Sequence, residues 1–426
     1  MRLVKTTGSE GHICFILPYS ETEFHLSQHL HESTARNWTK GYRVSVDIVA
    51  ITEIKAIALR APIETPVRTS FGIMTDRPAV FIEVRDREGH RGLGEVWCNF
   101  PSVGAEHRAR LALATVGPLL QRLSPLPVST IFARLMQALH ILALQSGEWG
   151  PLRQVAAGFD MACHDLGARR AGLPLHAFLR EAYGLEGPCA RQVRAYASGI
   201  GPEQPAAIAA AEQARGHRAF KLKVGFGEAV DRRALDAIRM AIGDGATLMI
   251  DANQGWACAE AIRLGRAFAA YDLAWLEEPL AADRPEAEWQ AVAEATPIPL
   301  AAGENMNATA EFAAAIDSRA LRFIQPDAAK WGGLSGCLDV ARRARAAGLT
   351  YCPHYLGGGV GLLASAHLLA AAGGDGLLEI DTNPNPWRDR LIAGLMPLAD
   401  GCVLLGDAPG LGLRPDVEAL AQLNEG

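Results

Sequence analysis

The part of the sequence from residue 190 onward predicts a (β/α)8 barrel. Eight short strand-like segments alternate with amphipathic helical segments between residues 192 and 381. A polar residue lies at or near the end of each strand-like segment, and consecutive ones are 23 to 28 residues apart, one strand-and-helix unit per step. In a barrel these strand ends meet at one mouth. The alternative, a doubly wound open sheet, would place its ligand at one switch point between strands.

The strand-like segments of this barrel lie at 193–198, 219–224, 247–252, 274–279, 298–304, 321–327, 349–354 and 377–381. Helical segments such as 206–216, 232–243, 258–271 and 335–348 lie between them. In the second strand segment, apolar residues occupy one face, and Lys221 and Lys223 occupy the other. Lysine is almost never fully buried unless it is paired, so this face is either solvated or directed at one site.

Ahead of the barrel, strand-like segments come first and helical segments follow, which predicts an α+β domain over residues 44–185. Its expected elements are a strand at 45–62, a hairpin at 78–97 with its turn at 86–90, and helices at 105–123 and 152–172. The last helix ends on Gly172, and glycine is favoured at the carboxyl end of a helix.

Residues 1–43 are polar, and we expect them to form a flexible extension. This stretch contains His25, His29 and His31, which suggest a metal cluster as an alternative. We interpret these histidines as ordinary residues of the extension.

The composition excludes several classes of protein. A chain of 426 residues with 49% hydrophobic and 21% charged residues is typical of a soluble globular protein with two or more domains. A net charge of −6 argues against a nucleic-acid partner. No segment has the roughly 18 consecutive apolar residues that a membrane helix needs. The eight cysteines are scattered without a CxxC pair, so we expect reduced thiols and a cytoplasmic protein.

Polar residues stand at or near every strand end of the predicted barrel: Tyr196, Lys223, Asp251, Glu277, Glu304, Asp327, His354 and Glu379. Three carboxylates on adjacent strands, Asp251, Glu277 and Glu304, would repel one another unless a cation joined them. Ligands that are all oxygen atoms suit a hard ion, and Mg²⁺ keeps positions open for substrate and water. Glu278 points to the opposite side of its strand from Glu277, and the pattern does not choose between the two.

Six motifs follow one another in a recognisable order: KLK at 221–223, DANQGW at 251–256, EEP at 277–279, GEN at 303–305, PDAAKWGG at 326–333 and PHYLGGGVG at 353–361. Over residues 45–426 they resemble the enolase superfamily, specifically its mandelate racemase subgroup. The resemblance implies a modified (β/α)7β barrel over 190–386 and an N-terminal α+β capping domain. It also implies that the C-terminal segment, 387–426, returns to the capping domain.

The resemblance also implies roles for individual residues. Asp251, Glu277 and Glu304 match the Mg²⁺ ligands of the family. Lys223 matches a general base on one face of the substrate, with a pKa lowered by the neighbouring cations. Lys221 matches the group that helps to hold the substrate carboxylate.

On the other face of the substrate, His354 matches a second base or acid, and Asp327 matches its hydrogen-bonded partner. Glu379 matches a residue that hydrogen-bonds the forming enediolate. Muconate-lactonising and dipeptide-epimerising relatives have a catalytic lysine at the place of Asp327, so the His–Asp pattern favours the mandelate racemase subgroup. Lys330 is out of that register, and we interpret it as structural.

The expected reaction is Mg²⁺-dependent removal of the proton α to a carboxylate, through an enediolate. A metal and ammonium groups would stabilise the charge that develops on the carboxylate oxygens. Loss of a β-hydroxyl would then dehydrate an aldonate or aldarate to a 2-keto-3-deoxy acid. Racemisation or epimerisation of a 2-hydroxy acid is an alternative. The motifs KLKVGFG, LMIDAN and EIDTNPNPWRDR are also similar to galactarolactone cycloisomerases, and a non-catalytic binding protein is the alternative that is not an enzyme.

Substrate specificity is expected to come from the loops of the capping domain and from polar residues near the strand ends. The candidate substrate contacts are Asn253, Arg68, Ser70, Trp97, Asn99, Phe100 and Tyr196. The glycines at 357–361 are expected to form the turn behind His354, because no GK[ST] follows to make a phosphate loop. The expected partner is a small-molecule carboxylate, and a homo-oligomer is expected because relatives commonly form oligomers.

Overall fold

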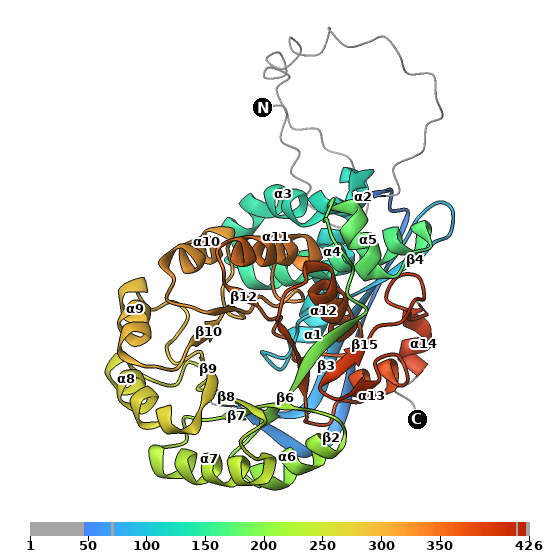
Figure 1. The fold of residues 1–426 in the computed structure, drawn as a ribbon. Helices are drawn as coiled ribbons and strands as arrows, with labels where there is room; N and C mark the ends of the chain where they lie inside the picture. The colour runs from blue at the N-terminus through green and yellow to red at the C-terminus, as the bar shows by residue number, and fades with distance from the viewer. Residues whose placement is uncertain (1–46, 70–71, 415, 423–426) are drawn as a thin grey trace. The chain divides into compact units, whose positions relative to one another are not determined.

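The structure is a computed structural model that describes residues 47–69, 72–414 and 416–422. The extension expected at 1–43, with its three histidines, lies outside the described residues. Figure 1 shows a ring of helices around short strands, accompanied by a separate antiparallel sheet, β2–β3–β4, drawn in blue.

The amino-terminal part has the predicted order of strands and then helices. Its elements are β1 (Ile48–Val49), β2 (Glu53–Thr69), β3 (Gly72–Arg85), β4 (Arg91–Val96), α1 (Gly104–Leu111), a π-helical turn (Ala112–Val116), α2 (Gly117–Leu123), β5 (Leu126–Pro127), a 3-10 turn (Val128–Thr130), α3 (Ile131–Ser146), α4 (Trp149–Ala171) and α5 (Leu175–Ala182). The antiparallel hairpin of β3 and β4 confirms the hairpin expected at 78–97. Helix α4 ends as expected at Gly172, which has a left-handed φ of 67°.

Helix α4 lies very close to β4, and the closeness depends on glycine. A Cβ on Gly94 would lie 2.0 Å from the carbonyl oxygen of Gly158, and one on Gly92 would lie 2.1 Å from that of Ala162. Any larger residue at either position would push the helix off the sheet. This close approach fixes β4, whose carboxyl end reaches the barrel.

The second part is a barrel of eight parallel strands. The strands are β6 (Gln192–Ile200), β7 (Ala219–Lys223), β8 (Thr247–Asp251), β9 (Leu273–Glu277), β10 (Leu300–Ala302), β11 (Phe323–Ile324), β12 (Thr350–Tyr351) and β13 (Leu377–Asp381). The helices between them are α6 (Pro205–Ala214), α7 (Glu228–Ile242), α8 (Cys258–Ala267) with a 3-10 turn (Ala269–Tyr271), α9 (Glu286–Ala295), α10 (Thr309–Ser318), α11 (Gly333–Ala346) and α12 (Gly359–Ala372).

The strands pair in sequence order from β6 to β12, and β13 pairs back with β6. Between β12 and β13, where no strand pairing occurs in the described residues, the backbone N–H of Leu377 donates to Cys352 Sγ at 3.3 Å. Eight strands with seven intervening helices form the expected (β/α)7β arrangement. Strands β7, β8 and β9 are five residues long, whereas β11 and β12 have only two residues each.

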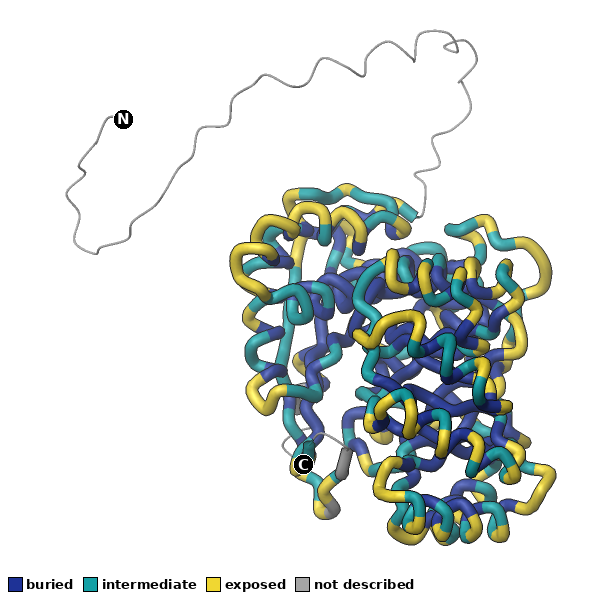
Figure 2. Tube along the Cα trace, turned by 90° about the vertical axis from the view of Figure 1, so that its left-hand side faces the viewer, coloured by how far each residue is buried: buried dark blue, intermediate teal, exposed yellow. Residues whose placement is uncertain are grey.

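The barrel interior is layered because successive side chains of a strand point to opposite faces. A deep apolar layer consists of Tyr196, Ala219, Met249, Trp275, Ala301, Cys352 and Leu377. The outward-facing residues of the strands pack against the helices, and Figure 2 shows the buried chain running through the interior beneath a more exposed outer face. Charged residues above the apolar layer therefore face the mouth of the barrel.

The carboxyl-terminal elements are α13 (Pro386–Ile392), β14 (Leu398–Ala399), β15 (Cys402–Leu404) and α14 (Val417–Gln422). Strand β15 pairs antiparallel with β6 of the barrel. The backbone N–H of Val417 donates to Glu83 of β3 at 3.1 Å, and Lys55 of β2 forms an ion pair with Glu418 at 2.7 Å. The end of the chain thus contacts both the barrel and the amino-terminal sheet.

One helical stretch, Val128–Ser146, is long and apolar enough by length and composition to cross a membrane. Core helices of soluble proteins pass the same test, so a single such stretch is weak evidence for a membrane span. Leu135 and Ala143 of α3 are fully buried, and α3 packs against α4. The stretch is accounted for as a helix of the amino-terminal part.

Candidate active site

One half of the site, here called the lysine side, consists of Lys221, Lys223, Asp251 and Glu277. Strand register puts Lys223 beside Asp251, and Asp251 beside Glu277. Lys223 Nζ donates to Asp251 Oδ2 at 2.6 Å. Burial and Lys221 lower the pKa of Lys223, but the carboxylates of Asp251 and Glu277 together raise it above its ordinary value. The lowered pKa expected for Lys223 depends on a neighbouring metal ion, so it stays a prediction.

Lys221 lies one layer deeper and is fully buried. Its Nζ forms ion pairs with Glu277 and, at 2.8 Å, with Glu379, and lies 3.7 Å from Asp251. Burial lowers the pKa of Lys221, but Glu277 and Glu379 raise it well above its ordinary value. The buried lysine is thus paired, as the physical cost of burying an ammonium group requires.

The carboxylate of Glu277 is surrounded by hydrogen-bond donors. It accepts from Lys221, from Trp275 Nε1 at 3.0 Å and from Gln325 Nε2 at 2.7 Å. Burial raises the pKa of Glu277 to about 7, although Lys221 acts in the opposite direction. Glu277 therefore points into the barrel towards Lys221.

Glu278, the second glutamate of the EEP motif, lines the cavity described below and is 1% exposed. It has a left-handed φ of 38°, and Asn305 Nδ2 donates to both of its carboxylate oxygens at 2.9 and 3.1 Å. Burial raises the pKa of Glu278, and the charges of Glu304 and Asp251 raise it further. Both glutamates of the motif are thus close to the other carboxylates, on two sides of one strand end.

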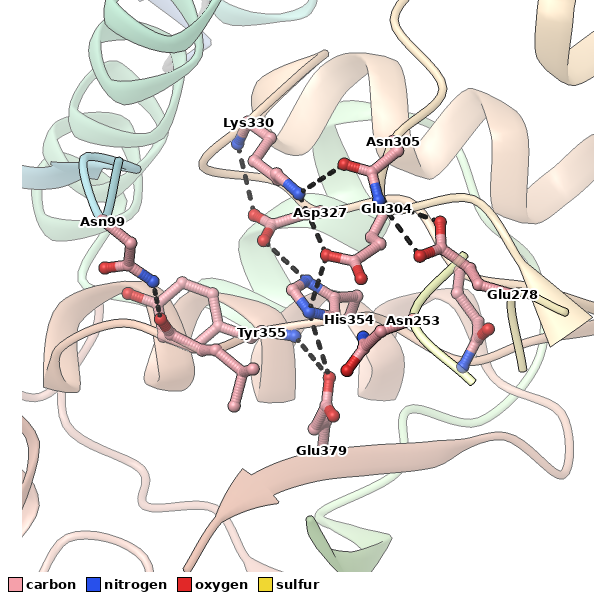
Figure 3. Close-up of polar contacts among 12 residues, drawn as sticks. Asn99, Asn253, Glu278, Glu304, Asn305, Asp327, Lys330, His354, Tyr355 and Glu379 are labelled. Carbon is pink, nitrogen blue, oxygen red and sulfur yellow. Dashed lines mark hydrogen bonds and ion pairs between the residues drawn. The ribbon is translucent and has the colours of Figure 1, made fainter. Parts of the chain in front are cut away.

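The other half of the site, here called the histidine side, consists of Glu304, Asp327, Lys330 and His354 (Figure 3). His354 Nδ1 lies 2.8 Å from Asp327 Oδ2, and His354 Nε2 lies 3.0 Å from Glu304 Oε2. Burial lowers the pKa of His354, but Glu304, Glu379 and Asp327 together raise it well above its ordinary value. These carboxylates favour the charged imidazole, which can donate from both ring nitrogens.

Glu379 lies between the two halves. Ser198 Oγ donates to it at 2.5 Å and the backbone N–H of Tyr355 at 3.0 Å, and His354 Nε2 lies 3.7 Å away. Burial raises its pKa, but Lys221 and His354 hold the pKa of Glu379 down to about 2. An ionised carboxylate accepts hydrogen bonds but cannot donate them.

Lys330, which the sequence led us to interpret as structural, belongs to the site. Its Nζ donates to Glu304 Oε2 at 2.9 Å and to Asn305 Oδ1 at 3.1 Å. The same ammonium group lies 5.0 Å from the ring centroid of Trp97, within the range of a cation–π contact. The signal in the sequence was its place three residues after Asp327, which puts it on the same loop.

The two halves meet at a cavity of about 980 Å3. Seven of the residues predicted for the site line it: Lys223, Asn253, Glu304, His354, Trp97, Asn99 and Phe100. The prediction did not include Arg77, Glu203, Gln204, Glu278, Asn305, Lys330, Asp381 and Asn383, which also line it. Arg77 of β3 forms a buried ion pair with Asp381 at 2.8 Å. The sheet β2–β3–β4, here called the capping sheet, therefore also forms the wall of the cavity near β13.

The structure corrects the expected contact of Tyr196 with the substrate. Tyr196 lies in the middle of β6, which continues to Ile200, and its side chain is fully buried in the apolar layer against Trp275. It is one layer too deep for the mouth. Lys221 is likewise absent from the described lining of the cavity, so its contact with a substrate stays a prediction. Ser70 and the side chain of Arg68 lie outside the described residues.

The donor chemistry of the mouth fits a divalent cation. Asp251 and Glu277 are neighbours across β8 and β9, and Glu304 follows the next strand, β10. All three offer only oxygen, the donor that Mg²⁺ prefers. Asp251 forms an ion pair with Lys223, Glu277 with Lys221, and Glu304 with Lys330 and His354.

A different cluster occurs in the turn between β3 and β4, where ligand atoms of Asp86, Glu88 and His90 lie within 4.8 Å of one another. Asp86 already accepts the backbone N–H of His90 at 2.8 Å and contacts its ring at 3.1 Å. Exposed acidic groups are common in turns without a metal, and these contacts account for the cluster as part of the turn.

Comparisons with known proteins agree with this fold and site. Residues 51–179 match the family model "Mandelate racemase / muconate lactonizing enzyme, N-terminal domain", and residues 206–420 match the model "Enolase C-terminal domain-like". A D-galactarolactone cycloisomerase of Agrobacterium fabrum is 30% identical over 387 residues, which cover 87% of this chain and 98% of that protein. Other relatives are dehydratases and racemases.

Two solved structures extend the comparison. A protein described as mandelate racemase/muconate lactonizing enzyme from Bordetella bronchiseptica is 48% identical, with a TM-score of 0.81 over 88% of this chain and 99% of that one. An L-talarate dehydratase from Polaromonas sp., solved with Mg and L-glucarate, is 30% identical, with a TM-score of 0.73 over 87% and 96%. The magnesium expected from the sequence is the ion in that relative. This chain belongs to the enolase superfamily, in its mandelate racemase/muconate lactonizing enzyme subgroup.

Proposed function

We propose that this protein removes the proton α to the carboxylate of an acid sugar in a Mg²⁺-dependent reaction and then expels the β-hydroxyl as water. The product is a 2-keto-3-deoxy acid. The observation that carries this proposal is that Lys223 and His354, from strands that are not neighbours in the sheet, line one cavity. His354 is also hydrogen-bonded to Asp327 at 2.8 Å, which orients its ring.

The proposed metal ligands are Asp251, Glu277 and Glu304. A magnesium ion held by these carboxylates supplies positive charge beside the substrate carboxylate, where a second negative charge develops. The carboxylate of Glu277 accepts hydrogen bonds from Lys221, Trp275 and Gln325, and in this proposal it also binds the ion.

We assign the first proton transfer to Lys223. Lys223 would be a neutral base if a bound cation shared the negative charge of Asp251 and Glu277, the two carboxylates that raise its pKa. The electron pair left on the α-carbon forms a double bond to the β-carbon, and the β-oxygen leaves. His354, held protonated by its carboxylate neighbours, gives the proton that makes the leaving group water. The enol that remains then becomes the keto acid.

Two buried residues have supporting roles in this proposal. Lys221 holds Glu277 and Glu379 in place through its ion pairs, from beneath the cavity. Glu379 is the residue that would hydrogen-bond the forming enediolate, as the family resemblance implies. It also accepts the backbone N–H of Tyr355 at 3.0 Å, next to His354.

Lys223 and His354 also support a second outcome. If the substrate offers a ring oxygen in place of a β-hydroxyl, the same elimination opens or rearranges a lactone, and the 30% identical cycloisomerase favours this reading. If no leaving oxygen is present, His354 returns a proton to the opposite face and the product is a racemate or epimer. A non-catalytic binding protein would show none of these reactions.

The test is incubation in D2O with Mg²⁺ and a library of monoacid and diacid sugars and their lactones. We expect exchange of the α-proton or formation of a keto acid with at least one compound. Lys223→Ala and His354→Ala should each abolish exchange on one face or the elimination itself. Absence of exchange with every compound, in protein shown to be folded, contradicts the proposal and favours a binding protein.

Several expectations about the whole molecule remain part of the proposal. We propose a flexible extension at 1–43, a capping domain at 44–185, the barrel at 190–386 and a returning segment at 387–426. We also propose a cytoplasmic homo-oligomer that binds neither nucleic acid nor membranes. The unpaired state of all seven cysteines in the described ranges supports a reducing compartment. Size-exclusion chromatography with light scattering measures the oligomeric state.

A further inference from the structure

The loops that carry Asp327 and His354 receive little support from the barrel sheet. The strands before them, β11 and β12, have two residues each, so both residues lie beyond the ladder of hydrogen bonds. Lys223 and Asp251, in contrast, are the last residues of five-residue strands and are paired in register. Within the barrel, Glu379 of β13 accepts the backbone N–H of Tyr355 at 3.0 Å, and further partners of these loops come from outside the barrel.

The end of β4 in the capping domain provides such partners. Residues 95–99, here called the strap, run past both loops. The backbone N–H of Trp97 donates to the carbonyl of Ala329 at 3.2 Å, two residues after Asp327. Asn99 Nδ2 donates to the carbonyl of Leu356 at 2.8 Å, two residues after His354 (Figure 3).

Glu95 makes the strongest of these contacts. Its carboxylate accepts the backbone N–H of Gly358 at 2.5 Å and that of Gly361 at 2.9 Å. Gly358 directly precedes α12 and Gly361 lies in its first turn, where unpaired N–H groups and the helix dipole favour a negative charge. Glu95 is only 3% exposed, so the two bonds are shielded from water.

The loop is shaped to admit this carboxylate. A Cβ on Gly358 would lie 2.7 Å from Glu95 Oε1, so glycine is needed there for the close approach. The backbone of Gly358 has a φ of −81°, which alanine also adopts. A methyl group at this position would therefore displace the carboxylate without straining the backbone itself.

We propose that Glu95 is a positioning residue for His354: by tying the first turn of α12 to the capping domain, it sets the place of His354 against Asp327 and the cavity. This inference rests on the proposed function, in which His354 acts on one face of the substrate. The contacts of the strap with the loops fall on residues 329, 356, 358 and 361, all on the histidine side. Lys223 should therefore be independent of Glu95.

The test compares Glu95→Gln with a matched control, Glu83→Gln. Glu83 is also a glutamate of the capping sheet, is also 3% exposed, and also accepts a backbone N–H at the start of a helix, that of Val417. The assay follows α-proton exchange in D2O, which reports on Lys223, and formation of the keto acid, which also needs the proton that His354 gives. Thermal unfolding of all variants shows how far each is destabilised.

We expect Glu95→Gln to slow keto-acid formation by roughly 10- to 100-fold, since a small misplacement of a catalytic group has effects of this size. Exchange of the α-proton by Lys223 should stay within about twofold and KM should not change, because the substrate contacts remain. Glu83→Gln should slow neither reaction. Gly358→Ala, which leaves Glu95 itself intact, should slow keto-acid formation as Glu95→Gln does.

Equal slowing of α-proton exchange and of keto-acid formation would show that Glu95 acts only through general stability, and no slowing of keto-acid formation would show that it does not position His354. Each result overturns this inference while exchange by the wild-type protein still supports the proposed function. If the wild-type protein exchanges no proton with any acid sugar, the proposed function fails first, and the role of Glu95 fails with it.

Discussion

The two sides of the active site are built in different ways. On the lysine side, the functional groups of Lys223, Asp251 and Glu277 end consecutive strands and stand side by side in register. On the histidine side, Asp327 and His354 stand on irregular loops after two-residue strands. The lysine side is therefore positioned by strand register within the barrel, whereas the histidine side also has hydrogen bonds to the capping domain.

Because of this difference, the stability of the fold and the rate of the reaction should respond to different substitutions. A buried ion pair in the sheet cannot be removed without leaving an uncompensated charge in the core. A loop held by a second domain can shift by a fraction of an ångström while the fold remains intact. We therefore expect variants of the lysine side to affect stability and activity together, and variants of the histidine side to affect mainly activity.

The largest effect is expected for Lys221→Met, which removes the buried ammonium group between Glu277 and Glu379. Two buried carboxylates would lose their partner, so the free energy of unfolding should fall by about 3–5 kcal/mol. Chemical denaturation measures this. The control is Lys330→Met on the histidine side, where Glu304 keeps His354 as a partner at 3.0 Å. Equal losses of stability in the two variants would contradict the comparison.

The second effect is expected for Asp327→Asn. Asparagine keeps an acceptor for the backbone N–H groups of Ala329 and Lys330, which Asp327 now binds at 2.8 and 3.2 Å. It loses the charge that orients and stabilises the imidazolium of His354, so kcat should fall by roughly 10²- to 10⁴-fold. Steady-state kinetics and unfolding, measured together, check this. A loss of stability as large as that of Lys221→Met would break the distinction between the two sides.

A third effect is expected in the pH dependence of stability, and it tests Glu95 of the strap by itself. Burial raises the pKa of Glu95 to about 7 from an ordinary value of 4.5, against the opposing effect of the Gly361 and Gly358 N–H groups. The folded protein therefore binds this proton more tightly than the unfolded chain. The contribution of Glu95 to stability is full below pH 4.5 and is lost as the pH rises through about 7.

Relative to Glu95→Gln, the wild-type protein should accordingly lose up to about 3 kcal/mol of unfolding free energy between pH 4.5 and 7.5, at about 1.4 kcal/mol per pKa unit. Denaturant titrations of both proteins at several pH values measure this difference. A constant difference across the range would show that the carboxylate keeps its ordinary pKa.

The smallest effect is expected at the two glutamates of the EEP motif. Glu277→Gln should weaken Mg²⁺ binding by at least roughly 10- to 100-fold, the loss typical for a residue that only supports a ligand, since here a ligand carboxylate itself is lost. Glu278→Gln should weaken it less, because Glu278 is held by Asn305 on the other side of the strand end. Calorimetric titration of metal-free protein with Mg²⁺ measures both. A greater loss in Glu278→Gln would move the ligand assignment to Glu278.

The recurring interval of 23 to 28 residues predicted both the barrel and the lysine side. Regular strands convert spacing along the chain into position in space, so residues one unit apart become neighbours, as Lys223, Asp251 and Glu277 do. The same regularity distinguished the two lysines, because alternate residues of a strand lie one layer apart. Tyr196 was misplaced for the same reason: its spacing identified the strand, but the strand continues four residues beyond it.

The sequence by itself determined the family, the barrel and the groups that end its strands, because these depend on local periodicity and on short motifs. Only the tertiary structure decided how deep each group lies, that Lys330 enters the cavity and that Glu278 faces Glu304. It alone showed that Glu95 holds the loop of His354. The glutamate is 259 residues from the histidine it serves, and no local pattern records a contact between two domains. Such contacts exist only once both domains have folded and packed against each other.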